Sequence, residues 1–211
     1  MIANVKVSWS GILAGVQPRI DLTRSFDQRY HNYLGYLLIV DGEAGGEPRT
    51  FTVRIGPAAQ ARHGFRAGDR VAGVAHAPAD ADAEAADLYK ASALKLLERA
   101  QSTPPAPPPW LGVPPALEVY RERGHRRLDA HTYDASCRTC QWGCRMAVAM
   151  IVDQWNPSVV RRRWETFCYG PKSCPLHRAG PLRKVPGRKG MSYTEEDWVD
   201  EEATAGRGAD E

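Results

Sequence analysis

All five cysteines of this 211-residue chain lie between Cys137 and Cys174, and the first 136 residues contain none. A disulfide-stapled secreted domain would be smaller and would spread its cysteines over its loops. The N-terminal stretch also lacks the basic region and small-residue cleavage pattern of a signal peptide. Clustered cysteines in such a chain predict thiolate metal ligands in a reducing compartment. We therefore expect a metal centre in a cytoplasmic protein.

Two ligand sets fit the cysteine spacing, which is Cys137-x2-Cys140-x3-Cys144 and, after 23 intervening residues, Cys168-x5-Cys174. In the first set, the leading CxxC pair and the last two cysteines form a closed tetrahedral zinc site, and Cys144 is a spare thiol. In the second set, the three leading cysteines and one distal cysteine hold a [4Fe–4S] cluster. In either set His131 or His177 is a candidate to replace one sulfur. Zinc is the favoured cofactor and the cluster is the alternative.

The charged residues of the chain are distributed in blocks. Residues 1–120 carry 12 Lys and Arg against 12 Asp and Glu, residues 121–190 carry 15 against 5, and residues 191–211 carry 1 against 8. The local charges of 0, +10 and −7 add to the net charge of +3. Such blocks indicate a charged partner or contact within the chain, which the small total alone would not suggest.

The basic block suggests DNA or RNA as a partner. Arginine and lysine side chains neutralise phosphates, and interleaved aromatic residues such as Trp164 and Phe167 provide surfaces for base stacking. A solvated face above an aromatic core is an equally available interpretation of this pattern. The candidate nucleic-acid contacts are Arg161, Arg162, Arg163, Arg183, Lys184, Arg188 and Lys189.

The first hundred residues predict β-strands. Residues 33–40 and 50–55 form two β-rich runs joined by a Gly-rich turn, residues 58–65 suit a short helix, and Gly68-Asp69 turns into a further strand at 70–75. With the segments FRAGDRVAGVAHA and DLYKASALKLL, residues 3–98 resemble an OB-fold. That resemblance implies a five-stranded Greek-key barrel, a fold that usually binds single strands or oligosaccharides.

We expect a mainly β protein in which an OB-like five-stranded barrel is followed by a small α/β, cysteine-rich metal-binding module. The apolar residues between Arg145 and Trp155 predict a helix, and residues 159–168 predict a strand that brings Cys168 to the site. The expected division is 1–100 for the barrel, 101–115 for a Pro-rich linker, 116–190 for the basic cysteine-rich module and 191–211 for a mobile acidic tail.

These features favour a binding protein over an enzyme. The sequence contains no Walker loop, HExxH motif or GxSxG motif, and no apolar run long enough to cross a membrane. The favoured hypothesis is a nucleic-acid-associated protein with a structural metal site. The alternatives are an iron–sulfur redox or catalytic component, and an adaptor that binds a protein partner through the Pro-rich segment or the acidic tail.

Overall fold

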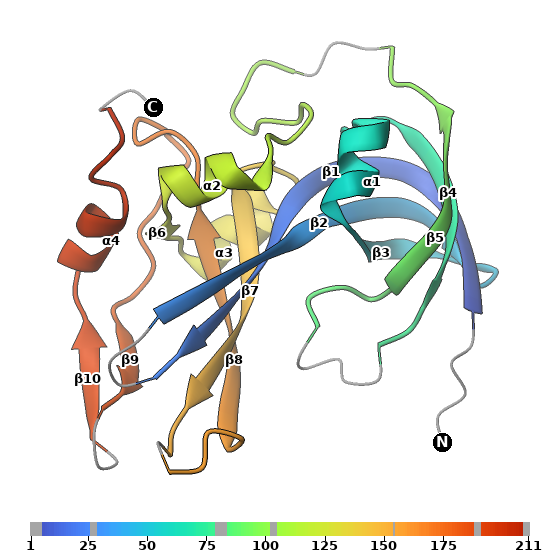
Figure 1. Cartoon of the computed structure of the whole chain (residues 1–211). Helices are drawn as coiled ribbons and strands as arrows, with labels where there is room; N and C mark the ends of the chain where they lie inside the picture. The colour runs from blue at the N-terminus through green and yellow to red at the C-terminus, as the bar shows by residue number, and fades with distance from the viewer. Residues whose placement is uncertain are drawn as a thin grey trace.

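Strand β1 (Lys6–Arg24) organises the molecule because it is long enough to pair with three other strands. It pairs antiparallel with β2 (Arg29–Ala44) from Trp9 to Arg24, and antiparallel with β4 (Arg70–His76) over its first seven residues. Its last residues pair in parallel with β7 (Gly143–Ile151). In the computed structural model, which describes residues 6–25, 29–78, 84–101, 105–153, 155–187 and 191–208, β1 thus joins both halves of the chain (Figure 1).

The N-terminal half contains the expected strands and short helix. Strand β2 pairs with β3 (Glu47–Ile55), helix α1 (Pro57–His63) follows, and β4 pairs with β5 (Tyr89–Glu98). Strand β3 reaches the segment before β5 through the single bridge Val53–Leu88 within the described residues. The expectation of a mainly β fold is confirmed. A closed barrel is not formed, because one bridge does not make a continuous ladder between β3 and β5.

The C-terminal half extends the same mixed sheet. Strand β7 pairs with β8 (Val160–Cys168), and β8 pairs with the short β6 (Arg126–Arg127). The sheet therefore continues across the expected linker at 101–115. The predicted helix over 145–155 is wrong, because most of these residues belong to strand β7. Both faces of β7 are largely covered, so its sequence lacks the polar and apolar alternation typical of a half-buried strand. The connecting elements are α2 (Leu117–Arg123), α3 (Ala130–Thr132) and the π-helix η1 (Tyr133–Cys137).

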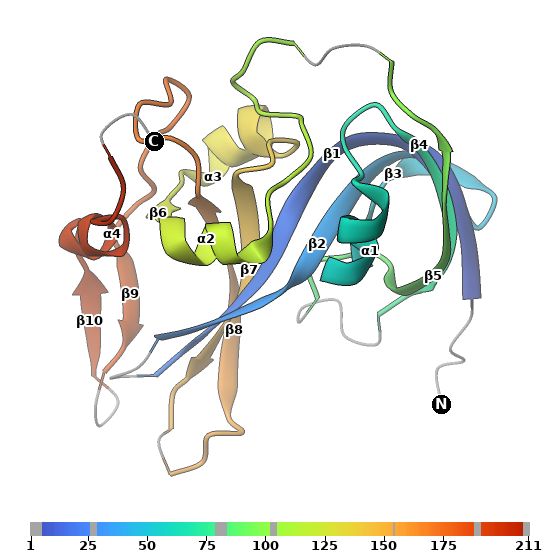
Figure 2. The ribbon, with the colours of Figure 1, turned by 45° about the horizontal axis from the view of Figure 1, so that its top comes forward.

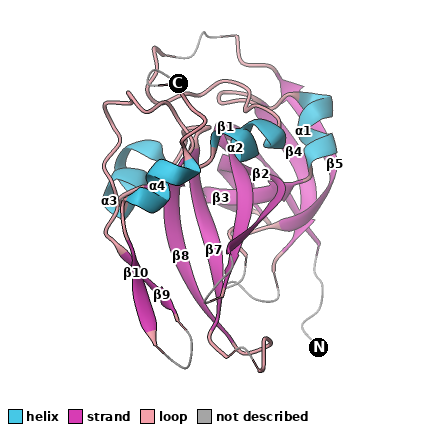
Figure 3. Cartoon of the chain, turned by 60° about the vertical axis from the view of Figure 1, so that its left-hand side comes forward, coloured by secondary structure: helices cyan, strands magenta, loops and turns pink. Residues whose placement is uncertain are grey.

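Residues 191–208, expected to belong to a mobile acidic tail, pack against arginines from both halves of the chain. Strand β9 (Arg183–Pro186) pairs with β10 (Ser192–Glu195), and helix α4 (Trp198–Ala203) follows. The physical reason is charge pairing: Asp197 and Asp200 contact the buried Arg127, and Glu195 contacts the buried Arg24. Figure 2 shows α4 above the β9–β10 hairpin, and Figure 3 shows that hairpin beside β8.

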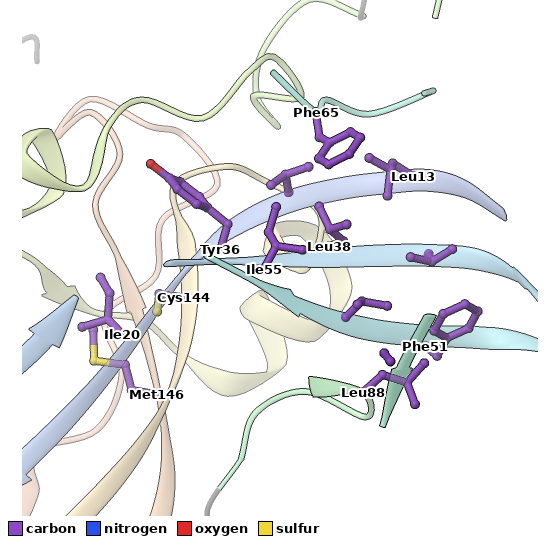
Figure 4. Close-up of a cluster of buried hydrophobic side chains, with 14 of the residues drawn as sticks. Leu13, Ile20, Tyr36, Leu38, Phe51, Ile55, Phe65, Leu88, Cys144 and Met146 are labelled. Atoms are coloured by element: carbon purple, nitrogen blue, oxygen red, sulfur yellow. The ribbon is translucent and has the colours of Figure 1, made fainter. Parts of the chain in front are cut away.

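One hydrophobic core runs through both halves of the sheet. It includes Leu13, Leu38 and Phe51 from the first strands and Cys144 and Met146 from β7, all less than 2% exposed. Figure 4 shows these side chains together. In the part of the chain that the structure describes, no helix is long and apolar enough to span a membrane.

Candidate metal centre and basic groove

The CxxC loop is a tight turn that lies directly on β1. Cys137 ends η1, its carbonyl accepts the N–H of Cys140 at 3.1 Å, and the carbonyl of Cys140 accepts the N–H of Gly143 at 3.0 Å. A Cβ atom on Gly15 of β1 would lie 2.2 Å from the carbonyl oxygen of Thr139, inside this loop. Glycine at position 15 therefore allows the loop backbone to contact the strand.

Gln17 of β1 fixes the same loop with its side chain, which is 1% exposed. Its Nε2 donates to the carbonyl oxygens of Cys137 at 2.8 Å and Cys140 at 2.9 Å. Its Oε1 accepts a hydrogen bond of 2.7 Å from the hydroxyl of Tyr133. Sequence reasoning missed Gln17, because it is one of many polar residues in β1 and nothing in the sequence distinguishes it from the others.

The pairing of β7 with β8 brings Cys168 to the CxxC loop. Gly143, three residues after Cys140, lies opposite Cys168 in the antiparallel ladder. Cys137, Cys140 and Cys168 are buried in one cluster. The apolar side chains that pack around them are Leu128, Tyr133, Trp110 and Trp142.

Cys174 lies at the end of a loop that three arginines hold through its backbone. Arg123 donates to the carbonyl of Tyr169 at 2.9 Å, and Arg207 donates to the carbonyl of Gly170 at 2.6 Å. Arg126 donates to the next two carbonyls, those of Pro171 and Lys172, at 2.9 and 3.3 Å. Cys174 itself is half-buried, whereas the other four cysteines are buried. The loop backbone is thus fixed, and its last thiol is partly accessible.

Electrostatic effects also connect the thiols of Cys137, Cys140, Cys168 and Cys174 with one another. Burial, and then the negative charges that Cys140, Cys168 and Cys174 would carry, raise the pKa of Cys137 to about 12. Burial raises the pKa of Cys140 to about 11, opposed by backbone N–H groups that include those of Trp142 and Trp110. Burial also raises the pKa of Cys168, opposed by the N–H of Gly170, which lies 3.3 Å from its Sγ, and by Arg126. The thiols of Cys137, Cys140 and Cys168 are therefore neutral at pH 7 when no cation is bound.

Cys144 belongs to a different environment. It is fully buried in the main core, and its Sγ lies 3.4 Å from the carbonyl oxygen of Pro18 on β1. Its partner across the ladder is Phe167, one residue before Cys168. Because side chains alternate between the two faces of a strand, Cys144 and Cys168 point to opposite sides of the sheet.

The two histidines considered as replacement ligands do not join the cluster. The Nε2 of His177 lies 3.1 Å from the carbonyl of Arg127, and His131 lies on the exposed short helix α3. Among the described residues, no group of three or more Cys, His, Asp or Glu side chains is arranged so that it could hold a metal ion as it stands. Any ion would therefore have to draw the sulfur atoms together.

A basic groove of about 550 Å³ lies between the β7–β8 and β9–β10 hairpins. Arg161, Arg163 and Lys184 line it, and none of its described lining residues is Asp or Glu. Its apolar lining comes from Met150, Val152, Val185, Pro186 and Met191. Three of the expected nucleic-acid contacts are therefore brought together at one place.

The remaining expected contacts differ from these three. Arg162 is exposed but alternates to the other face of β8, while Arg188 and Lys189 lie outside the described residues. Arg183 is 9% exposed, 2.7 Å from the carboxylate of Glu165, and stacked over Phe167 at 4.2 Å. Its position gives it a role inside the protein, because a buried guanidinium with these partners is not available to a phosphate.

Arg183 is part of a buried network of opposite charges. Arg24 donates to Glu165 at 2.9 Å and to Glu195 at 2.8 Å, and Arg163 also pairs with Glu165. The guanidinium of Arg163 additionally donates to the carbonyl of Lys184 at 2.8 Å. The network joins β1, β8, β9 and β10 and fixes the walls of the groove.

No family model, curated protein or solved structure matches this chain.

Proposed function

We propose that this protein binds single-stranded nucleic acid in the groove between the two hairpins, and that a metal ion stabilises its cysteine-bearing half. The observation that carries the nucleic-acid proposal is the lining of the groove, where Arg161, Arg163 and Lys184 face one cavity with no carboxylate among its described residues. Clustered cations of this kind attract phosphates and release bound counterions.

The apolar part of the lining favours a single strand over a duplex. A duplex presents mainly phosphates to a protein groove, whereas a single strand also exposes its bases to apolar and aromatic side chains. Met150, Val152 and Met191 provide apolar surface within the groove. Trp155 lies in the turn that follows β7 and is 88% exposed, so its indole ring is accessible for stacking.

The topology of the N-terminal half is consistent with this proposal. Strands β3, β2, β1, β4 and β5 are neighbours in that order, and α1 lies between β3 and β4 in the chain. We propose that these strands form an open variant of an OB-like barrel, an architecture often used for single strands. Fold analogy alone does not assign a function, so the proposal rests on the residues that line the groove.

The metal would be structural. The CxxC turn, the end of β8 and the loop to Cys174 are three separate segments of the chain, and a shared ion would hold them together. This role requires no open coordination position and no catalytic residue, which agrees with the apolar surroundings of Cys137, Cys140 and Cys168.

Fluorescence anisotropy with a labelled single strand of DNA or RNA and a duplex of equal length tests the nucleic-acid proposal. We expect tighter binding of the single strand, with an affinity that falls steeply as salt rises. Arg161→Ala and Lys184→Ala should each weaken binding by about threefold to tenfold and reduce the slope against log salt by about 1. Arg62→Ala, on exposed α1, is the matched control. A salt-independent affinity, or equal loss in the control, contradicts the proposal.

A further inference from the structure

The ladder between β7 and β8 decides which cysteines can share one ion. Gly143 faces Cys168 across this ladder, so the CxxC loop that precedes Gly143 continues toward the same end of the sheet. Cys137 and Cys140 are buried with Cys168 among the same apolar side chains. Two chain segments 28 residues apart, at Cys140 and Cys168, therefore present their thiols to one place.

Cys144 is excluded from that place by strand geometry. A three-plus-one cluster would need Cys144 on the same side as Cys140, which a helix after Cys140 would provide. The residues form a strand instead, and Cys144 points into the main core with Met146 (Figure 4). Its Sγ contacts the carbonyl of Pro18. A [4Fe–4S] cluster therefore lacks its third ligand in the leading loop.

The geometry points to one zinc ion held by Cys137, Cys140, Cys168 and Cys174, with Cys144 left as a core thiol. This inference rests on the metal-binding part of the proposed function and is independent of the nucleic-acid part. Four sulfurs without an open position form the closed tetrahedral arrangement that structural zinc prefers, with metal–sulfur distances of about 2.3 Å.

Binding of the ion is an exchange of protons for zinc, with no oxidation. Each thiol transfers its proton to solvent as its sulfur bonds to Zn²⁺, so four thiols release up to four protons and the site becomes a dianion. Arg126 and Arg207 act on Cys168 in the direction that favours its thiolate. The N–H of Gly170 lies 3.3 Å from the Sγ of Cys168, and the N–H of Trp142 bonds to Cys140. These donors would stabilise coordinated thiolates as outer-sphere partners.

The four side chains must converge when the ion binds, because no described group of three ligands is already in place. The half-buried Cys174 provides the accessible side. Arg123, Arg126 and Arg207 bind its loop through backbone carbonyls, so these hydrogen bonds do not involve the Cys174 side chain. Cys174 is close enough to act electrostatically on both Cys137 and Cys168.

Metal analysis of the full-length protein and of its five single Cys→Ser variants tests this inference. We expect about one zinc per chain in the unmodified protein and in Cys144→Ser. We expect loss of most of the zinc, and a lower melting temperature, in Cys137→Ser, Cys140→Ser, Cys168→Ser and Cys174→Ser. Cobalt(II) added to the zinc-stripped, unmodified protein should give the absorption bands of a tetrahedral four-sulfur site. This second readout needs no variant to fold.

The outcomes separate the inference from the wider proposal. Iron in place of zinc, zinc loss in Cys144→Ser, or retention of zinc in Cys137→Ser or Cys168→Ser overturns this ligand set while leaving a metal-stabilised protein. A protein that binds neither zinc, iron nor cobalt overturns both the ligand set and the metal part of the proposed function. Anisotropy measurements decide the nucleic-acid part separately, whichever metal is found.

Discussion

Gln17 donates two hydrogen bonds to the CxxC loop from the neighbouring strand. Replacing it by alanine would leave the buried hydroxyl of Tyr133 without its acceptor, and would remove the second donor from the carbonyls of Cys137 and Cys140, which keep their N–H partners within the turn. An unsatisfied buried group costs about 1–3 kcal/mol and each lost hydrogen bond about 1 kcal/mol, so Gln17→Ala should lower the free energy of unfolding by about 3 kcal/mol. It should also weaken zinc affinity by about tenfold or more, because outer-sphere partners orient the ligands. Chemical denaturation and chelator competition measure the two effects.

Gln101 provides the matched control for that substitution. It is exposed, and Gln101→Ala should change the free energy of unfolding by no more than about 0.5 kcal/mol. If Gln17→Ala retains both the stability and the zinc affinity of the unmodified protein, the side chain does not hold the loop.

The sequence indicated the cysteines directly, because their clustering is unusual. It did not reveal Gln17, since one polar residue among many in β1 is recognised as important only when its distant partners are known.

Strand β7 determines which cysteines lie near one another, and the sequence pattern wrongly predicted a helix there. The residues from Arg145 to Ile151 alternate poorly, because both faces of β7 are covered over most of its length. A short apolar run of this kind does not distinguish a buried strand from a helix. The assignment mattered chemically: a helix would have placed Cys144 beside Cys140, whereas the strand turns it into the core. The strands over 33–40, 50–55 and 159–168 were predicted correctly because their composition is strongly β-favouring.

Strand β9 contains two adjacent cations with opposite roles. Arg183 is buried against Glu165, while Lys184 is exposed and lines the groove. Arg183→Ala should lower the free energy of unfolding by about 3 kcal/mol, since it removes one partner from a buried charge network. Lys184→Ala should leave stability within about 0.5 kcal/mol and weaken nucleic-acid binding. Denaturation and anisotropy on both variants check this; the reverse pattern would move the binding surface to Arg183.

At the scale of the whole molecule, the charge blocks proved to be partners of one another. The sequence indicated either an external partner or contact within the chain. The acidic C-terminal elements contact Arg127 of the basic block, and Arg24 and Arg29 of the neutral block. The expected mobility of residues 191–208 rested on their polar composition alone. Composition could not reveal that Glu195 enters a site where it is 5% exposed between arginines. That network also lies beside the buried His125 and the half-buried His31, so we expect the stability of the fold to depend on pH.

His31 and His125 lie with ring centroids 4.7 Å apart next to the Arg24–Glu165–Arg183 network. Burial, followed by the charges of Arg24 and Arg29, lowers the pKa of His31 to about 4, and burial holds the pKa of His125 well below its usual value. Between pH 6.5 and about 4, His31 binds a proton in the unfolded chain but stays neutral in the folded protein. The free energy of unfolding should therefore fall as the pH is lowered through this range, by about 3 kcal/mol from His31 alone. Urea denaturation across this range should show a shallower pH dependence for His31→Gln, whereas His131→Gln, on exposed α3, should follow the unmodified protein. Acid would also protonate the thiolates of the proposed metal site, so the measurement compares the slopes of the two variants. Equal slopes would mean that His31 is already charged in the folded protein.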